Sequence, residues 1–445
     1  MANCRPTYTV CATVVTGLEP GALEECREMF GPNTRGKKAR GKIFFELDSL
    51  ENVQQLSRLC SVDKYSVVVA DLKQLLMDVS SKDVVLEMFE SLPRKLIWTS
   101  ALDAWEAYYG KTWTSSKTHN YSLPNNNGEQ LVPDDLHTHT LSEIQAVAVP
   151  SIPHFKQAEV KKLSDLCASV LEHDRTTSED DRTTFRVTCT RSGTNHCVSS
   201  MDVAKHFGSG IVVMFGWKVK LVDPDIEVLV SIVDNDCVIS VALTQDSRHI
   251  RNITHFGPTT LRSTIAYGLV RLAKPEPGEV VIDPMCGGGS ISIEAAIGWP
   301  LCCHLAGDMH ELATPRTLAN VEDVNKQRAT ECGSPSISVG VIQWDVTQLP
   351  LKAHSIDVVI TDLPFGKKVG KKVDNWKLYP NALLELGRIC RPSTGRAVLL
   401  THDTKAMTQA LKANFHLWRK KWISWVNVGG LKTAVYELVR TKAIE

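Results

Sequence analysis

Two short runs in the C-terminal half of the chain carry the residues best suited to chemistry. Val280–Asp283 is an apolar run that ends in an acid and leads into the turn Pro284–Gly289, and a later apolar run ends in the same way within Thr361–Gly366. Such a run, followed by a Pro- or Gly-rich turn, places polar groups at the edge of a sheet where ligands bind. Together the two runs predict methyl transfer from S-adenosylmethionine to a planar nitrogen.

The glycine-rich turn fits a cofactor that has no pyrophosphate. Gly287 and Gly289 allow the backbone to approach a ligand closely, but the third spaced glycine of the dinucleotide fingerprint is missing, which disfavours a nicotinamide dehydrogenase. S-adenosylmethionine presents an amino acid, a ribose diol and an adenine, which acids at strand ends can bind. We expect Asp283 beside the turn, Asp308 at the ribose hydroxyls and Asp345 at the adenine amine. The predicted cofactor-binding residues are Thr260, Asp283, Met285, Cys286, Gly287, Gly289, Asp308 and Asp345.

The second run, Asp362–Phe365, contains the groups that an amino methyltransferase needs, and its four residues are predicted to be catalytic. The amino group of a nucleobase is a weak nucleophile because its lone pair is delocalised, so a site must accept its hydrogens and favour the attacking form. The carboxylate of Asp362 and the carbonyl of Leu363 can do this. Pro364 fixes the turn, and Phe365 offers a face on which a flipped base can stack. A capped strand-to-helix turn is the simpler structural explanation, but the upstream glycine turn argues against it.

Around these motifs the chain alternates strand and helix patterns, which predicts a doubly wound, Rossmann-like sheet of seven strands with helices between the first five. The strands are expected at Val280–Asp283, His304–Asp308, Ile337–Trp344, Ile356–Thr361, Arg396–Thr401, Ile423–Val428 and Ala434–Val439, the last two as an antiparallel pair. A helix over Leu261–Leu272, capped by Thr259 or Thr260, precedes them. One acid at a strand end commonly caps a helix, but three in order on successive strands favour a cofactor site.

Residues 1–110 predict a small α+β layer of ferredoxin-like type. Strand patterns at 8–15, 42–47 and 65–69 alternate with helix patterns that open near Glu19 and at Leu50. Residues 111–182 lose this periodicity and are rich in Pro, Asn and Asp, which predicts a mobile insertion with one helix over Gln157–Leu171. His137 and His139 lie there without further clustered ligands, so we expect no metal site.

Residues 183–245 carry a second small α/β pattern. Phe185–Arg191 alternates apolar and polar residues, a helix pattern runs from Ser199 or Ser200 to Met214, and strands are expected at 227–233 and 238–243. The order Phe-Arg-Val-Thr-Cys-x-Arg-x-Gly, helix and hairpin resembles a THUMP domain, and this resemblance implies recognition of the acceptor end of transfer RNA. Residues 246–278 are then a linker with a helix, and residues 279–445 form the methyltransferase domain.

The chain from Tyr8 to about Arg440 resembles the family of THUMP domain-containing protein 3. The resemblance rests on Arg251–Ser263, Asp283–Gly287, Thr361–Lys367 and Trp425–Leu431. It implies formation of N2-methylguanosine near position 6 in the acceptor stem of tRNA, together with a small zinc-ribbon activator subunit that adds a strand to the catalytic sheet as a heterodimer. The residues themselves offer such a partner only an apolar edge around Ile337–Ile342. Leu363 departs from the commoner proline of amino methyltransferases, but the mechanism needs only its carbonyl.

Positive charge is concentrated where RNA is expected, although the formal net charge is zero. From Leu363 to Lys421 the chain has 13 Lys and Arg residues against 3 acids. This excess directly follows the Asp362 turn, where it can meet phosphates. The predicted RNA-binding residues are Arg186, Arg191, Lys218, Arg248, Arg251, Lys367 and Lys368.

Length and composition predict a multidomain protein of a reducing compartment. The 445 residues are 43% hydrophobic, which is enough for two or three cores. No apolar run reaches the length of a membrane span, and the first residues lack the apolar stretch of a signal peptide. The 13 cysteines include no Cys-x-x-Cys pair, so we expect free thiols, with Cys286 in a packing role. We expect a cytoplasmic location with an additional nuclear pool allowed, and no membrane partner.

Two rival functions stay open from the residues alone. The turn at Asp362 recognises an amino group and not a particular base, so methylation of adenine or of a protein glutamine is the alternative among enzymes. A catalytically silent RNA-binding or assembly protein is the alternative from another class, and the presence of all four acids at the strand ends argues against it.

Overall fold

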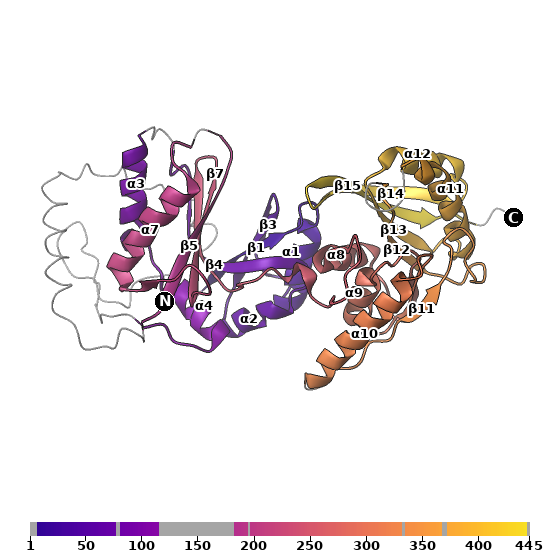
Figure 1. Cartoon of the computed structure of the whole chain (residues 1–445), viewed down its shortest axis with the longest axis horizontal. Helices are drawn as coiled ribbons and strands as arrows, with labels where there is room; N and C mark the ends of the chain where they lie inside the picture. The colour runs from indigo at the N-terminus through magenta and orange to yellow at the C-terminus, as the bar shows by residue number, and fades with distance from the viewer. Residues whose placement is uncertain are drawn as a thin grey trace, which may run out of the picture.

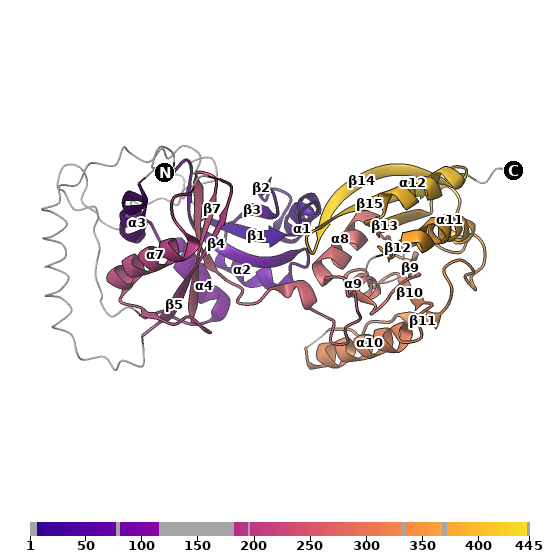
Figure 2. The ribbon, with the colours of Figure 1, turned by 45° about the horizontal axis from the view of Figure 1, so that its top comes forward.

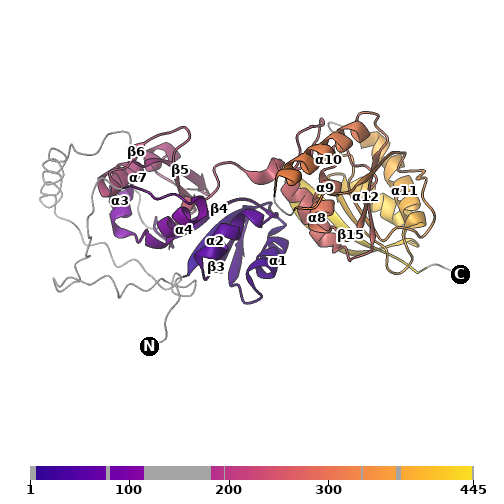
Figure 3. The same ribbon diagram turned by 90° about the horizontal axis from the view of Figure 1, so that it is seen from below.

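Figure 1 shows an elongated molecule with two lobes, each built around one sheet. The structure, a computed structural model, describes residues 7–76, 81–114, 182–194, 196–331, 334–366 and 372–442. The N-terminal lobe (residues 7–242) holds an eight-stranded sheet, and the C-terminal lobe (residues 263–442) holds a seven-stranded sheet. Residues 243–262, here called the joint, connect the two lobes, and Figure 3 shows them passing from one lobe to the other.

The sheet of the N-terminal lobe has the strand order β2-β3-β1-β4-β8-β7-β5-β6. Its strands are β1 (Tyr8–Val14), β2 (Gly36–Ala39), β3 (Lys42–Leu47), β4 (Val62–Leu72), β5 (Thr184–Ser192), β6 (Lys218–Val219), β7 (Ile226–Val233) and β8 (Asp236–Ala242). The helices are α1 (Glu19–Phe30), α2 (Leu50–Gln54), α3 (Lys82–Ser91), α4 (Thr99–Tyr109) and α7 (Ser200–Phe215). β5 runs parallel to β6 and β7, and the other neighbours are antiparallel.

The two units predicted within residues 1–245 share this one sheet. β4 pairs with β8, so Ser66 lies opposite Ala242 and Leu72 lies opposite Cys237. The sequence patterns predicted the longer strands within a few residues but missed β2, α3 and α4. β2 is a short, polar edge strand without an apolar pattern. α3 packs closely against α7, because a Cβ atom at Gly210 on α7 would come within 2.2 Å of the carbonyl oxygen of Glu90 on α3.

The predicted domain boundaries remain predictions, although the sheet itself is continuous. The predicted helix over Gln157–Leu171, together with His137 and His139, lies outside the described residues.

The sheet of the C-terminal lobe has the strand order β11-β10-β9-β12-β13-β15-β14. Its strands are β9 (Val280–Asp283), β10 (Cys303–Asp308), β11 (Gly340–Gln343), β12 (Val358–Asp362), β13 (Arg396–Thr401), β14 (Trp418–Val428) and β15 (Leu431–Arg440). The helices are α8 (Ser263–Ala273), α9 (Ser290–Gly298), α10 (Ala313–Thr330), α11 (Lys372–Ile389) and α12 (Thr404–Ala413). The first five strands in this order are parallel, and β15 is antiparallel to both its neighbours. The predicted doubly wound, seven-stranded sheet is confirmed.

The connection from β11 to β12 differs from the prediction, because it contains no helix. Oδ1 of Asp345 accepts hydrogen bonds of 2.8 Å from the N–H and the hydroxyl of Thr347, which closes a turn where a helix would have to begin. The connection uses its length to bury Trp344, Leu349 and Ile356 in the core of the C-terminal lobe. The helix predicted for this connection is wrong, because its apolar residues do not follow a helical period.

The two lobes meet first along α1 and α8. Gly268 on α8 lies so close to Leu18 that a Cβ atom would come within 2.6 Å of the leucine Cδ1. Arg271, also on α8, donates hydrogen bonds of 2.7 and 2.8 Å to the carboxylate of Glu28 on α1. The contact therefore combines close packing with a two-pronged ion pair.

The hairpin of β14 and β15 makes a second contact between the lobes, and Figure 2 shows it reaching toward α1. The N–H of Asn427 donates to the carbonyl of Thr16 at 3.1 Å. Gly17 has a φ of +102°, and a Cβ atom there would come within 2.0 Å of the carbonyl oxygen of Trp425. Only glycine fits this contact, because any side chain would collide with the hairpin backbone.

Candidate active site

Three parallel strands end in acids at the same edge of the C-terminal sheet. β9 lies between β10 and β12, so Asp283 lies between Asp308 and Asp362. The three carboxyls are close enough for the charge of Asp308 to act on Asp283 and for that of Asp283 to act on Asp362. The structure thus brings these acids together as the sequence predicted.

Asp362 carries a buried oxygen without a partner. Its Oδ1 atom accepts no hydrogen bond from any residue that the structure describes. Burial, and after it the charge of Asp283, raises the pKa of Asp362 to about 8. An unpartnered buried carboxyl is costly in a folded protein unless a ligand completes its bonds. The side chain is therefore placed to accept hydrogens from an amino group.

Asp283, in contrast, makes its bonds within the protein. The residue is 3% exposed. Its Oδ1 atom accepts hydrogen bonds from the hydroxyl of Thr361 at 2.7 Å and from the N–H of Met285 at 3.2 Å. Burial raises the pKa of Asp283 to about 7. These bonds connect the end of β9 to β12 and shape the start of the glycine turn, so Asp283 positions the groups around it.

The glycine turn has the backbone geometry that its composition predicted. Gly287 and Gly289 have φ angles of +54° and +83°, in the left-handed region that side chains disfavour. A Cβ atom on Gly289 would come within 2.6 Å of Thr317 Cγ2, whereas nothing lies within 4 Å of the corresponding position at Gly287. The N–H of Gly287 donates to Asp308 Oδ2 at 3.0 Å. The turn is fixed by its neighbours on one side and open to a ligand at Gly287.

Asp308 ends β10 and Asp345 follows the neighbouring strand β11, and both also accept hydrogen bonds from backbone N–H groups. Besides the bond from Gly287, Asp308 accepts one from the N–H of His310 at 2.9 Å. Asp345 is exposed and holds the turn to Thr347 described above. Each carboxylate retains lone pairs beyond these bonds, so a role toward a cofactor is compatible with a role in the turn.

Buried polar side chains hold the Asp362–Phe365 turn. The carbonyl of Pro364 accepts hydrogen bonds from the hydroxyl of Tyr379 at 2.7 Å and from the amide of Asn375 at 3.0 Å. Both residues come from α11 and are at most 1% exposed. Within the described part of the chain, no group donates to the carbonyl of Leu363. The carbonyl of Pro364 is therefore bound within the protein, and the carbonyl of Leu363 is left for a ligand.

Sequence reasoning missed three residues of this site. Asn375 and Tyr379 lie four positions apart on α11, a spacing that places two polar groups on one helix face directly after the turn. Asn320 on α10 is fully buried and accepts hydrogen bonds from the N–H groups of Thr254 at 3.0 Å and His255 at 2.7 Å, while its amide donates to the carbonyl of Gly288 at 2.9 Å. It fixes the joint against the glycine turn.

Phe365, the last residue of the turn, is partly exposed, and its ring centroid lies 6.0 Å from that of His402. It is therefore accessible to a base, as its predicted stacking role requires.

Thr260 and Cys286 have structural partners. α8 begins after Arg262 without a side-chain cap, so the predicted cap by Thr259 or Thr260 is wrong. The hydroxyl of Thr260 accepts a hydrogen bond from the N–H of Gly257 at 2.8 Å and so closes a turn of the joint. Cys286 is buried beside Thr317, and burial raises the pKa of its thiol, as expected of a packing residue.

Three of the predicted RNA-binding arginines are engaged in protein contacts. Arg186 pairs with Glu227 at 3.0 Å, and Arg191 donates to the hydroxyl of Ser200 at 3.1 Å. Arg251 lies in the joint and pairs with buried Glu294 at 2.7 Å, with its side chain only 13% exposed. The structure gives Arg251 a structural place, because it cannot reach a phosphate without leaving a buried carboxylate unpaired.

The remaining predicted cations are placed differently. Lys218 on β6 is exposed. Arg248 lies in the joint, and Lys367 and Lys368 lie outside the described residues.

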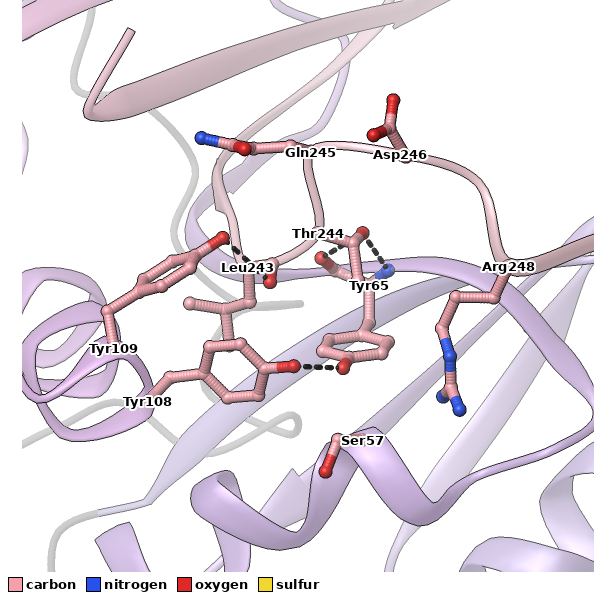
Figure 4. A pocket seen from close by; sticks show the side chains of 9 residues that line it. All are labelled: Ser57, Tyr65, Tyr108, Tyr109, Leu243, Thr244, Gln245, Asp246 and Arg248. Carbon is pink, nitrogen blue, oxygen red and sulfur yellow. Dashed lines mark hydrogen bonds between the residues drawn. The ribbon is translucent and has the colours of Figure 1, made fainter. Parts of the chain in front are cut away.

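A hollow of about 290 Å³ opens where the N-terminal lobe meets the joint. Figure 4 shows Tyr65, Tyr108, Tyr109 and Arg248 among the residues that line it. The hydroxyls of Tyr65 and Tyr108 lie 2.5 Å apart, and Arg248 donates to the carbonyl of Leu59 at 2.7 Å. None of the predicted catalytic or cofactor-binding residues lines this hollow, so it is separate from the acids at the sheet edge.

Neither a metal-ligand cluster nor a membrane-spanning helix occurs within the described ranges. No three His, Cys, Asp or Glu side chains gather there as a metal ion would require. No helix in those ranges combines the length and the apolar character needed to cross a membrane.

Comparison with known proteins assigns both lobes to families. Residues 248–434 match the RMKL-like methyltransferase domain, and residues 159–242 match the THUMP domain. The second match includes residues placed by the sequence prediction in the insertion. The human tRNA (guanine(6)-N(2))-methyltransferase THUMP3 is 41% identical over 97% of this chain and 88% of its own length.

More distant relatives share the architecture. The bovine U6 snRNA (guanine-N(2))-methyltransferase THUMPD2 is 27% identical over 88% of this chain and 78% of its own length. The crystal structure of TrmN from Thermus thermophilus superposes with a TM-score of 0.64 at 19% identity and covers 97% of this chain and 99% of that one. At that identity the structural match concerns the fold alone, and it extends across both lobes.

Proposed function

Because the chain belongs to the family of the THUMP3 tRNA (guanine(6)-N(2))-methyltransferases, we propose that it transfers a methyl group from S-adenosylmethionine to the exocyclic amine of a guanosine in tRNA. The observation that carries this proposal is the buried Oδ1 of Asp362, which lacks a partner at the edge of a methyltransferase sheet. A catalytically silent protein would have no reason to keep a costly unpaired carboxyl there.

The residues at the strand ends fit the cofactor. S-adenosylmethionine supplies a methyl group activated by a sulfonium cation. The open backbone at Gly287 can approach it closely, and Asp308 and Asp345 retain acceptor capacity toward its hydroxyls and amine. A cation beside Asp283 and Asp362 favours their ionised forms and so lowers the pKa of each.

The catalytic turn acts on the amine. Asp362 and the carbonyl of Leu363 accept its hydrogens, which returns electron density to the nitrogen and orients its lone pair toward the methyl group. The amine becomes positive as the new bond forms, so the carboxylate binds the transition state more tightly than the ground state. Asp362 can then accept the proton that the methylated amine releases. Phe365 stacks on the flipped base, and Tyr379 keeps the turn in place through Pro364.

The N-terminal lobe recruits the RNA in this proposal. The THUMP match and the exposed Lys218 support electrostatic capture of the acceptor end. The hollow lined by Tyr65, Tyr108 and Arg248 combines aromatic rings with a cation, a chemistry that suits a nucleotide.

We further propose that a small zinc-ribbon activator subunit pairs with β11. This strand is the edge of the sheet, and no described strand pairs with its outer side. Ile342 on β11 is 38% exposed, so an added strand would cover apolar surface as well as backbone groups. Ile342→Lys should then weaken co-purification of the two subunits while the cofactor still binds. We also propose a cytoplasmic location with a nuclear pool, which fractionation of cells with a tagged protein would test.

The decisive experiment is methylation of a defined transcript. The purified protein, with activator supplied, is incubated with S-adenosylmethionine and an unmodified tRNA transcript that has guanosine at position 6. Nucleoside mass spectrometry should find N2-methylguanosine, and a transcript with adenosine at this position should stay unmethylated there. Methylated adenosine, or no RNA product alongside a methylated glutamine in a protein, would overturn the proposed substrate.

A further inference from the structure

A strip of aromatic and basic residues leads away from the catalytic turn along the surface of the C-terminal lobe. The ring of Phe365 lies 6.0 Å from that of His402. Nδ1 of His402 is 2.9 Å from the carbonyl oxygen of Lys432, and Nζ of Lys432 lies 4.3 Å from the ring centroid of Trp425. Each contact joins the next, so the four residues form one continuous strip, here called the β14 strip.

Strand register places the far end of this strip level with Asp362. Trp425 pairs with Ala434, Ala434 pairs with Thr401 on β13, and Leu400 beside it pairs with Asp362. β12 and β14 are separated by β13 and β15, and three strand spacings amount to about 14 Å. Trp425 is therefore about two or three nucleotides from the base that the turn would hold, at the ~6 Å spacing of an extended strand.

Apart from the cation–π contact between them, Trp425 and Lys432 make no side-chain hydrogen bond or ion pair within the described residues that would explain their exposure. Trp425 is 49% exposed, although tryptophan is among the residues that normally bury most of their surface. Lys432 is exposed, and its ammonium meets no carboxylate in the ion pairs formed within the described residues. The strip ends where Asn427 contacts Thr16, so it leads from the catalytic turn toward the N-terminal lobe.

We propose that the β14 strip binds the substrate RNA strand next to the methylated nucleotide, with a flanking base on Trp425 and a flanking phosphate at Lys432. An exposed aromatic ring beside an unpaired cation is the combination that binds a nucleic-acid strand without reading its sequence. The strip thereby holds the strand on one side of the flipped base. This inference rests on the proposed function, because it assigns a subsite for the same RNA.

The test compares matched variants in binding of the tRNA transcript, measured by fluorescence anisotropy. Trp425→Ala should weaken binding about tenfold, and Trp425→Phe should restore most of the affinity because it keeps a stacking face. Lys432→Gln should reduce the slope of log affinity against log salt by about one. Thermal unfolding and cofactor affinity should stay unchanged in all three variants.

Two controls match these changes in chemistry but lie off the strip. Trp422 is 63% exposed on the same strand, and the alternation of side chains directs it to the opposite face from Trp425. Lys352 is exposed and precedes β12, at the edge of the sheet away from the active site. Trp422→Ala and Lys352→Gln should leave RNA affinity and its salt dependence unchanged.

The outcomes separate this inference from the proposed function. If the wild-type protein methylates the transcript but Trp425→Ala binds it as tightly as the wild type, the β14 strip does not contact RNA and the inference is wrong. Equal losses from Trp422→Ala and Trp425→Ala would also overturn it, because they would reflect a general effect on the hairpin. A wild-type protein that binds the transcript on the strip but does not methylate it would instead overturn the proposed function.

Discussion

Asp362 at the edge of the C-terminal sheet and Arg186 in the N-terminal lobe are satisfied in opposite ways. The Oδ1 atom of Asp362 is buried and has no partner among the described residues, whereas the half-buried Arg186 pairs with Glu227. Formal charge predicts binding in both places, but only the first arrangement leaves the charge available. The difference teaches that a charged side chain can bind a ligand only where some of its hydrogen-bonding groups are still unused, so exposure alone is a poor guide.

The largest effect is expected when the unpaired carboxyl of Asp362 loses its charge. Asp362→Asn keeps the size and one acceptor oxygen but removes the negative charge that stabilises the amine as it becomes positive. Single-turnover methylation should fall by about two to four orders of magnitude, while RNA affinity changes little and cofactor affinity falls far less than the rate. Near-normal rates in Asp362→Asn would show that another group orients the amine.

The same substitution should stabilise the cofactor-free protein. The pKa of Asp362 is raised above its unfolded value, so its contribution to stability is fully present below the unfolded pKa and is lost as the pH rises toward 8. Asparagine cannot ionise, so the stability advantage of Asp362→Asn should grow between pH 5 and pH 8, to about 2–4 kcal/mol. Denaturant unfolding at the two pH values measures it, and an advantage that is equal at both would contradict the raised pKa.

The next prediction concerns Asp308, whose carboxylate already accepts hydrogen bonds from backbone N–H groups. Asp308→Ala should weaken S-adenosylmethionine binding by about 1.5–3 kcal/mol, the range for a charge-assisted hydrogen bond. Calorimetry measures this, with RNA affinity as the control that should stay constant. An unchanged cofactor affinity would mean that Asp308 serves only the turn at Gly287.

Arg186 in the N-terminal lobe should behave in the opposite way to Asp362. Arg186→Gln leaves Glu227, which is 8% exposed, without its cation, so the free energy of unfolding should fall by about 1–2 kcal/mol. RNA affinity should change little, because the guanidinium is already engaged. A clear loss of RNA affinity without destabilisation would show that the pair opens to bind RNA.

The smallest expected effect concerns an exposed cation of the same lobe. Lys218→Gln should leave the stability unchanged and reduce the slope of log RNA affinity against log salt by about one. Titrations at several salt concentrations give this slope. A slope equal to that of the wild type would remove Lys218 from the RNA surface.

Sequence and structure agree best where chemistry follows directly from a strand end. The acids of β9, β10 and β12 were predictable, because an apolar run fixes both the strand and the edge at which its last residue lies. The polar residues that support them were not. Tyr379 binds the carbonyl of Pro364 and Asn320 binds that of Gly288, and such contacts depend on how separate elements pack.

The same reason explains the differences in the joint and in the N-terminal lobe. Arg251 looked like a cation for phosphate, but its partner Glu294 lies on a helix of the following lobe. No local sequence pattern predicts an ion pair of this kind, and none predicts that two separate units share one sheet. Periodicity records which face of an element is apolar, but it does not record what that face or edge meets.

The pairing of β4 with β8 has a consequence for how the chain folds. The edge of β4 is covered only when residues 236–242 of β8 pair with residues 62–72. These paired residues are far apart in the sequence, so this part of the sheet has a high contact order and should form slowly. During synthesis the first four strands are complete long before their neighbour emerges from the ribosome, and an open strand edge invites association with other chains. A fragment that stops near residue 110 would keep that edge permanently, and it should aggregate where the intact protein does not.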